Sequence, residues 1–280
     1  MLFLGIASFA LRNQAIMQQE ITTTFEQIRP QLRSYILRMT ASAADTDDIV
    51  QDTWIKASLN IASFQGNSSL KTWFFAIASN LAKDNLRLKK RWTEDATDIC
   101  KQEALGNRAF FEEAMNIRMT SSQGHFEIKE HITFCFTCIS KSLPLEQQVA
   151  LLLKEVYEFK VKEIAEILDI SEAMGKYYLH VGRSKMIEIF DRRCALINKE
   201  GVCHQCTELN GIFNPKQKAQ EELIKIEMAR DAEKKDKEAL FDLRMKIVQG
   251  IDPYESDAAE LQLHHLEHNR GVMERYLETT

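Results

Sequence analysis

Apolar residues recur at helical spacing along almost the whole chain. Between residues 21 and 92, such runs alternate with short polar breaks at Thr40–Asp47 and Gln65–Ser69. Each break holds short polar side chains that could cap the helix after it: Asp45, Thr46 or Asp47 in the first, and Ser68 or Ser69 in the second. The pattern predicts a small bundle of helices in this part of the chain.

The predicted helix after the second break carries two stripes. Its apolar stripe should face a core and contains Leu70, Phe74, Ile77, Leu81 and Leu88. Its second stripe contains Trp73, Ala76, Asn80, Lys83, Arg87 and Lys90. Six bases against one acid give the segment Lys71–Trp92 a local charge of +5. Such a stripe suits single-stranded nucleic acid, but a solvated charged face has the same pattern.

The composition changes between residues 93 and 131, where eight acids face four bases and apolar residues are sparse. We interpret this segment as an acidic linker that is at best partly helical.

A second helical unit follows over residues 132–193. A helix with a buried face at Val149–Val156 precedes a short helix at Val161–Leu168, a turn at Asp169–Ser171 and a longer helix from Glu172 to about Phe190. Ser171 is placed to cap the longer helix. A short helix, a tight turn and a longer helix together make the helix-turn-helix pattern, in which the last helix reads a DNA major groove.

Composition narrows the fold class. The chain has 280 residues and a net charge of −5, with only ten Gly and four Pro, so we expect an all-α protein rather than a loop-rich β protein. No apolar run approaches the roughly 20 residues that a membrane span needs. Six dispersed cysteines favour a reduced, cytoplasmic protein. No phosphate loop, nucleophile elbow or other catalytic motif is present, so we expect no enzyme activity.

The cysteines include two Cys-x-x-Cys pairs. Cys135 and Cys138 lie in an apolar run and are best explained as small core residues. Cys203 and Cys206 flank His204 in a turn-rich segment, where they either bind zinc, form a redox pair or serve only structure. No cofactor is otherwise required. His264, His265 and His268 share a predicted helix and are interpreted as a solvated face rather than a metal site.

Two separated segments together resemble bacterial RNA polymerase sigma factors of the extracytoplasmic-function (ECF) type in the sigma-70 family. The first is Asp48–Ala57, followed by Phe64–Gly66 and Leu70–Asn80. It is similar to the family region that docks on the polymerase β′ clamp helices and then melts and reads the −10 element. The second runs from Leu143 to Leu168 and is similar to the region that reads the −35 element.

The resemblance implies a domain plan and partners. The plan is an N-terminal extension (1–20), a region 2-like bundle (21–92), the acidic linker (93–131), a region 4-like helix-turn-helix domain (132–193) and a helical C-terminal extension (194–280). The implied partners are core RNA polymerase (the β′ clamp helices and the β flap), promoter DNA and, as a further candidate, an anti-sigma factor; no membrane is involved.

The resemblance also implies interface residues. Those expected to bind polymerase are Asp48, Gln51, Asp52 and Lys56. Those expected to bind DNA are Gln65, Asn67, Trp73, Asn80, Lys83, Arg87 and Lys90 in the first unit and Lys176, Tyr177, His180, Arg183 and Lys185 in the second.

Two questions remain open at the level of sequence. The main hypothesis is a promoter-specificity subunit, and the alternative is a helix-turn-helix regulator with a metal- or redox-sensing extension. Beyond Pro215 the extension holds fifteen acids against eleven bases. It could therefore compete with DNA for Lys176, Arg183 and Lys185, or act only as a stabilising cap.

Overall fold

The computed structural model describes residues 2–61, 64, 66–120, 128–194 and 236–280, with side chains from residue 16 onward except at 118 and 128. The helices are α1 (Leu2–Thr40), α2 (Ala43–Leu59), α3 (Leu70–Leu86), α4 (Ala96–Gly106), α5 (Arg108–Thr120), α6 (Ile128–Ser140), α7 (Leu145–Leu151), the π-helical η2 (Leu152–Val156), α8 (Val161–Leu168), α9 (Glu172–Arg193), α12 (Lys237–Gln249) and α13 (Ala259–Thr279). No strand occurs within these ranges, and the expected all-α class is confirmed.

Side-chain caps set where several of these helices begin, α2 and α3 among them. Ser69 accepts a hydrogen bond from the backbone N–H of Thr72 (3.0 Å) and starts α3, as the sequence predicts. The cap of α2 differs from the prediction: Ser42, not one of the three residues at 45–47, accepts from the N–H of Asp45 (3.1 Å). Asp45 instead lies in the first turn of α2, where its negative charge interacts favourably with the positive end of the helix dipole.

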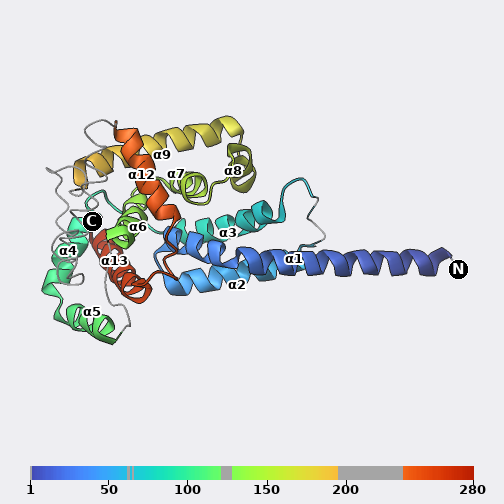
Figure 1. Ribbon diagram of the computed structural model, residues 1–280, viewed down its shortest axis with the longest axis horizontal. Coiled ribbons are helices and arrows are strands. Elements are labelled where there is room, and N and C mark those ends of the chain that lie inside the picture. Colours follow the sequence, from blue (N-terminus) through green and yellow to red (C-terminus); the bar gives the residue numbers. More distant parts are fainter. Residues whose placement is uncertain (1, 62–63, 65, 121–127, 195–235) are drawn as a thin grey trace.

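Helices α1, α2 and α3 lie side by side, and the N-terminal end of α1 extends beyond α2 and α3 (Figure 1). The short helix α8 packs on α3, and α12 crosses α6, η2 and α9. One hydrophobic core joins all of these elements, with Phe74, Leu152 and Phe241 among its fully buried members. The two expected domains and α12 of the extension therefore share a single core rather than having one each.

Aromatic rings fill the junction between the two expected domains. The ring of Phe159 lies 4.8 Å from that of Phe75 on α3, centroid to centroid, and the ring of Tyr157 lies 5.5 Å from that of Tyr35 on α1. The hydroxyl groups of Tyr157 and Ser34 share a 2.9 Å hydrogen bond. This packing holds the helix-turn-helix unit against the first bundle.

A second core explains the segment that the sequence presents as a linker. Helices α4 and α5 pack against α13, and Ala96, Cys100 and Ala114 are buried there together with Leu266 and Met273. Residues 96–120 form two packed helices, so the prediction of a linker that is at best partly helical is wrong for this stretch. Its buried residues are mostly small, so they leave little apolar signal, and their partner helix comes about 150 residues later in the chain.

The helix-turn-helix prediction is confirmed in its geometry. Asp169 ends α8 in the left-handed conformation (φ 54°), and Ser171 caps α9 by accepting from the N–H of Met174 (3.2 Å). Gly182 lets α9 approach α7 closely, because a Cβ there would lie 3.4 Å from both the Cβ and the carbonyl oxygen of Gln147. Helix α9 is therefore fixed in its orientation relative to α7.

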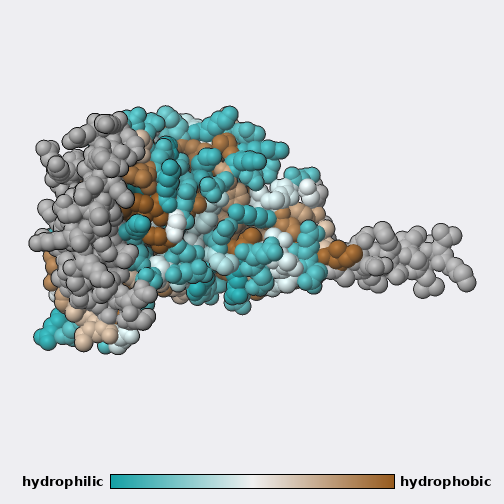
Figure 2. Space-filling model, viewed as in Figure 1, coloured by the Kyte–Doolittle hydropathy of each residue, from teal (hydrophilic) through white to brown (hydrophobic). Residues whose placement is uncertain are grey.

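The face of the molecule seen in Figure 2 is mainly hydrophilic, with separate apolar patches. One exposed apolar residue contradicts the sequence prediction: Leu88, assigned to the core stripe of the third helix, is 98% exposed. The reason is that α3 ends at Leu86, so the helical spacing that would turn Leu88 inward no longer applies.

Candidate polymerase and nucleic-acid interfaces

The expected polymerase-binding residues lie together on the outer face of α2. Asp48, Gln51, Asp52 and Lys56 are all exposed, while Ile49, Val50, Thr53 and Ala57 turn into the core. Two apolar side chains that the sequence interpretation did not include, Ile55 (43% exposed) and Leu59 (78% exposed), extend this surface toward the end of the helix.

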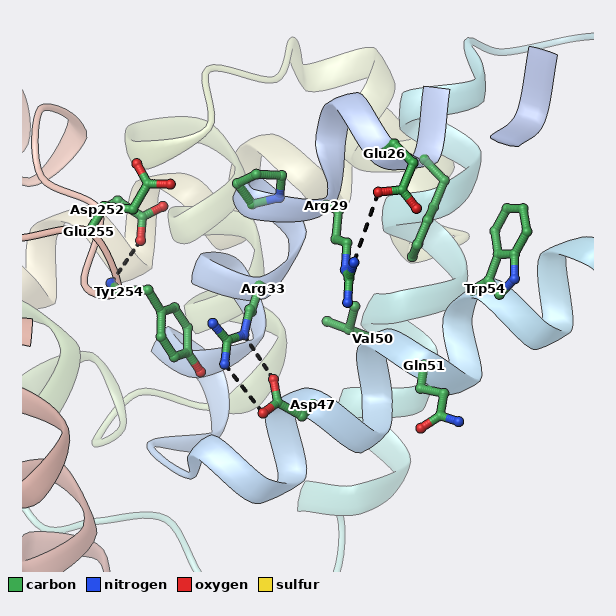
Figure 3. Close-up of a pocket in the computed structure, with 12 residues that line it drawn as sticks. Glu26, Arg29, Arg33, Asp47, Val50, Gln51, Trp54, Asp252, Tyr254 and Glu255 are labelled. Carbon is green, nitrogen blue, oxygen red and sulfur yellow. Dashed lines mark hydrogen bonds and ion pairs between the residues drawn. The ribbon is translucent and has the colours of Figure 1, made fainter. Parts of the chain in front are cut away.

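A groove runs between α1 and α2 beside this face (Figure 3) and encloses about 750 Å³. Phe25 and Trp54 line it, with their ring centroids 4.9 Å apart. The loop between α12 and α13 also lines the groove, through Asp252, Tyr254 and Glu255. Residues of the C-terminal extension thus border the expected polymerase contact.

The expected DNA-binding residues of the first unit are spread along α3 and its two ends. Asn67, Asn80, Arg87 and Lys90 are exposed, whereas Trp73 and Lys83 are half-buried; Gln65 lies outside the described residues. The ring of Trp73 packs on Phe64 (5.2 Å) and on Phe74 (5.7 Å), so most of it serves the core. Arg87 pairs with Asp84 at 3.1 Å, and both side chains are mostly exposed.

The last helix of the extension contacts the basic segment after α3. The ammonium of Lys90 donates to the carbonyl oxygen of Leu277 (2.7 Å), and that of Lys89 lies 3.7 Å from a carboxylate oxygen of Glu274. Glu267 on the same helix accepts from the backbone N–H of Ala43 (2.9 Å), next to the start of α2. Carbonyls at the C-terminal end of a helix carry partial negative charge, as phosphate oxygens do.

The exposed face of α9 carries the expected duplex-reading residues. Lys176, Tyr177 and His180 are exposed, with Tyr177 at 56%. Arg183 already has partners within the chain. Its guanidinium donates hydrogen bonds to Glu155 (2.9 Å) and to Asp242 of α12, and it lies 4.8 Å from the ring centroid of Phe241.

Lys185 and Arg192 form ion pairs with the segment between α3 and α4. The ammonium of Lys185 lies 2.8 Å from a carboxylate oxygen of Glu94, which also accepts from Arg192. Hydrogen bonds from these two cations lower the pKa of Glu94. The tail was expected to compete with DNA for three cations, and among these Arg183 is the one that pairs with the tail in the described part of the chain.

Two buried cations that the sequence interpretation missed tie the units together. Arg38 is 1% exposed and donates to the backbone carbonyl of Ile251 (2.8 Å) in the extension. Lys141 donates to the carbonyls of Met39 (2.7 Å) and Thr40 (3.0 Å), which end α1, and burial lowers its pKa to about 7. Buried bases are rare, so the sequence interpretation did not place either residue in the interior.

The described cysteines are structural. Cys100, Cys135, Cys138 and Cys194 are buried and free of disulfides, and burial raises the pKa of Cys138 to about 12, which keeps it a thiol at neutral pH. Core placement of Cys135 and Cys138 is confirmed. Cys203 and Cys206, the expected zinc or redox pair, lie outside the described residues. Within those residues, no cluster of three or more metal-ligating side chains occurs.

The three histidines of α13 contradict the expectation of a solvated face. His265 is 6% exposed, and burial lowers its pKa to about 3. The ring of Phe110 on α5 lies 4.8 Å from that of His264 and 3.9 Å from that of His268, so the two half-buried histidines flank it. These rings dock α5 onto α13.

None of the helices described combines the length and apolar character that a bilayer-spanning helix needs.

Two segments of the chain match known protein families. The protein-family model for Sigma-70 region 2 matches residues 24–92, and that for Sigma-70, region 4 matches residues 134–186. The ECF RNA polymerase sigma factor EcfG of Rhodopseudomonas palustris is 29% identical over 158 residues, which are 56% of this chain and 77% of the relative. The RNA polymerase sigma factor YlaC of Bacillus subtilis is 26% identical over 60% of this chain and 91% of its own length.

A complex of the sigma factor RpoE with the anti-sigma factor NepR from Bartonella quintana aligns with a TM-score of 0.41 and 16% identity, over 62% of this chain and 98% of the other.

The two regions, in this order and on these helices, define the class: the chain belongs to the sigma-70 family of RNA polymerase sigma factors, which are transcription initiation factors. Within that family it is of the extracytoplasmic-function type. Residues 187–280 lie beyond both matched segments.

Proposed function

We propose that this chain directs core RNA polymerase to its promoters, with α2 as the polymerase contact, α3 and its flanks as the surface for the melted −10 element, and α9 as the helix that reads the −35 duplex. The observation that supports it most is the α2 face, where two carboxylates, an amide and a base are exposed within the segment that matches Sigma-70 region 2. Such a mixed face suits a protein partner more than it suits a nucleic acid.

We further propose that the described state is a closed form of the factor. Asp242 pairs with Arg183, and the carbonyl of Leu277 at the end of α13 accepts from Lys90, so the extension binds one expected DNA-contacting cation on each of the two surfaces. Promoter binding then requires these contacts to be exchanged for phosphates. The extension would set how easily the factor engages DNA.

Run-off transcription on genomic fragments with core polymerase tests the main proposal. We expect transcripts that depend on this protein, and their loss in an Asp48→Arg/Asp52→Arg variant that no longer co-elutes with core enzyme. A Glu20→Arg/Glu260→Arg variant, which reverses two exposed acids elsewhere on the molecule, is the matched control. Co-elution of the first variant at the wild-type level would refute α2 as the polymerase contact.

A further inference from the structure

A second pocket lies between the basic segment after α3 and the C-terminal end of α13. It encloses about 420 Å³, a volume in the range of small-molecule sites. The first bundle contributes Lys89, Lys90 and Arg91 to its wall, and α13 contributes Arg270. Lys141 lines it from the position directly after α6. The pocket is therefore built jointly by the two matched regions and the extension.

The pocket carries an excess of positive charge. Five bases against two acids, Glu274 and Glu278, give its lining a formal charge of +3 when every base is protonated. Glu274 is already paired with cations of the wall, since it lies 3.1 Å from Arg270 and 3.7 Å from Lys89. Glu278 is exposed. A lining of this charge attracts an anion.

Three of the bases bind uncharged acceptors and have further N–H donors to give. Lys141 donates two of its three N–H groups to backbone carbonyls, and Lys90 donates one of three to a carbonyl. Arg91 donates two of its five, to a carbonyl and to a side-chain amide. Within the described residues, none of the three pairs with a carboxylate. Burial, with Arg91 and Lys89 nearby, lowers the pKa of Lys141 to about 7, so an anion in the pocket would favour its charged form.

The lining has an order from its entrance to its floor. Leu88, which is 98% exposed, and the exposed Lys90 belong to the entrance. Arg91 is half-buried, and Lys141 is 3% exposed, with its ammonium 5.1 Å from the ring centroid of Trp92. The backbone of a nucleic acid can meet the exposed lysine but cannot bring a phosphate to a buried one. A compact ligand can do both.

We propose that this pocket binds a small phosphorylated ligand, a nucleoside di- or triphosphate, with its phosphates against Lys90, Arg91 and Lys141 and its heterocycle against Leu88 and Leu277. A chain of two or three phosphates carries enough negative charge to balance the lining. The two leucines line the pocket and offer apolar surface to a ring.

The site has a consequence for the extension. A ligand that contacts both the first bundle and Arg270 of α13 binds the closed form better than an open one, and so shifts the chain toward the closed form. This effect on DNA binding rests on the proposed function, whereas the site itself does not.

Isothermal titration calorimetry of the full-length chain with ADP, GDP, ATP and GTP tests the site. We expect submillimolar binding of at least one of these nucleotides, weakened by added salt, and no binding of adenosine or guanosine, which lack the phosphates. The measurement needs neither polymerase nor promoter, so its failure is distinct from a failure of the proposed function. Absence of binding by all four nucleotides at millimolar concentration would overturn the proposal.

Leu88 offers a variant that changes neither the cations nor the core. Leu88→Glu places a negative charge at the entrance and should bind nucleotide about twofold to fivefold more weakly than Leu88→Gln, which adds no charge. Lys90→Gln should weaken binding by about the same factor. Lys154→Gln, at an exposed lysine of η2 outside the pocket, is its control and should bind like wild type. Thermal unfolding of each variant establishes that the fold is retained.

Fluorescence anisotropy with a labelled promoter duplex separates the remaining outcomes. Nucleotide should lower the DNA affinity of the wild-type chain, and less so that of Leu88→Glu. Nucleotide binding that Leu88→Glu and Lys90→Gln retain at full strength would place the site elsewhere and overturn the proposal. If no nucleotide binds while Lys90→Gln weakens DNA binding, the pocket cations serve DNA instead. Nucleotide binding that leaves DNA affinity unchanged would keep the site and overturn its coupling to the closed form.

Discussion

The pairing of Arg183 with Asp242 can be tested by one isosteric change, Asp242→Asn. Arg183 lies on α9, the helix proposed to read duplex DNA, and Asp242 lies on α12 of the extension. The substitution removes the charge from the acceptor while retaining its shape. Arg183 keeps its second partner, Glu155, at 2.9 Å.

The size of the effect follows from exposure. The Asp242 side chain is 55% exposed and that of Arg183 is 25% exposed, so solvent screens the pair and it contributes about 0.5–1 kcal/mol. Arg183 must leave Asp242 before it can meet a phosphate. Removing the charge should therefore raise DNA affinity by about twofold to fivefold, the factor that corresponds to this energy.

Fluorescence anisotropy with a labelled promoter duplex, titrated with the full-length chain, measures this gain. Asp242→Glu keeps the charge and serves as the control. In an Arg183→Ala background the gain from Asp242→Asn should vanish, since the competing cation is absent. An unchanged affinity in the single variant, or a full gain without Arg183, would refute the proposed competition.

Three further predictions concern other contacts. Lys83→Ala and Arg87→Ala should each lower affinity for promoter DNA and reduce the salt slope by about one, and an unchanged slope in a salt titration would exclude phosphate contact. Because burial lowers the pKa of Lys141 to about 7 from 10.5, the folded chain binds fewer protons than the unfolded chain between these pH values, and the free energy of unfolding should rise with pH there. Urea unfolding should show that Lys141→Met removes a rise of about 2 kcal/mol between roughly pH 7.5 and 9, and equal pH dependence in both proteins would contradict this. Gly182→Leu should lower the free energy of unfolding by about 1–3 kcal/mol, because the side chain forces α9 away from α7. Gly175→Ala, where the nearest contact of the added Cβ is 3.7 Å, should leave this free energy unchanged or raise it by up to about 1 kcal/mol. Equal shifts of the two variants in thermal unfolding would count against the close approach of α9 to α7.

Local signals made the helix-turn-helix unit predictable from sequence. The cap at Ser171 and the apolar spacing of Ile164 and Leu168 act within one or two turns of chain, and both are found as expected. The order of the two motif-bearing segments was enough to identify the family. The same local reasoning placed Leu88 in the core, because spacing alone does not show that the helix has ended at Leu86.

Long-range contacts account for what the sequence could not predict. The number of acids in the extension suggested that it competes with DNA for the cations of α9. It could not show that Asp242 pairs with Arg183, or that Lys185 pairs with Glu94. The burial of His265 depends on helices that are distant in sequence, so a solvated face was the natural interpretation. The groove beside α2 is partly made by Tyr254, about 200 residues further along the chain, and no spacing rule could have placed it there.

The hydrogen bond from Arg38 to Ile251 spans 213 positions of the chain, which has a consequence for how each new molecule matures. During synthesis, α1 and the helix-turn-helix unit leave the ribosome before the loop that satisfies Arg38 has been made. About 60 residues separate the end of α9 from that loop, which corresponds to about 3–12 s of translation at about 5–20 residues per second. For that interval the nascent factor has both of its matched regions and lacks its closing segment. A freshly made chain thus passes through an open state before the extension can close over it.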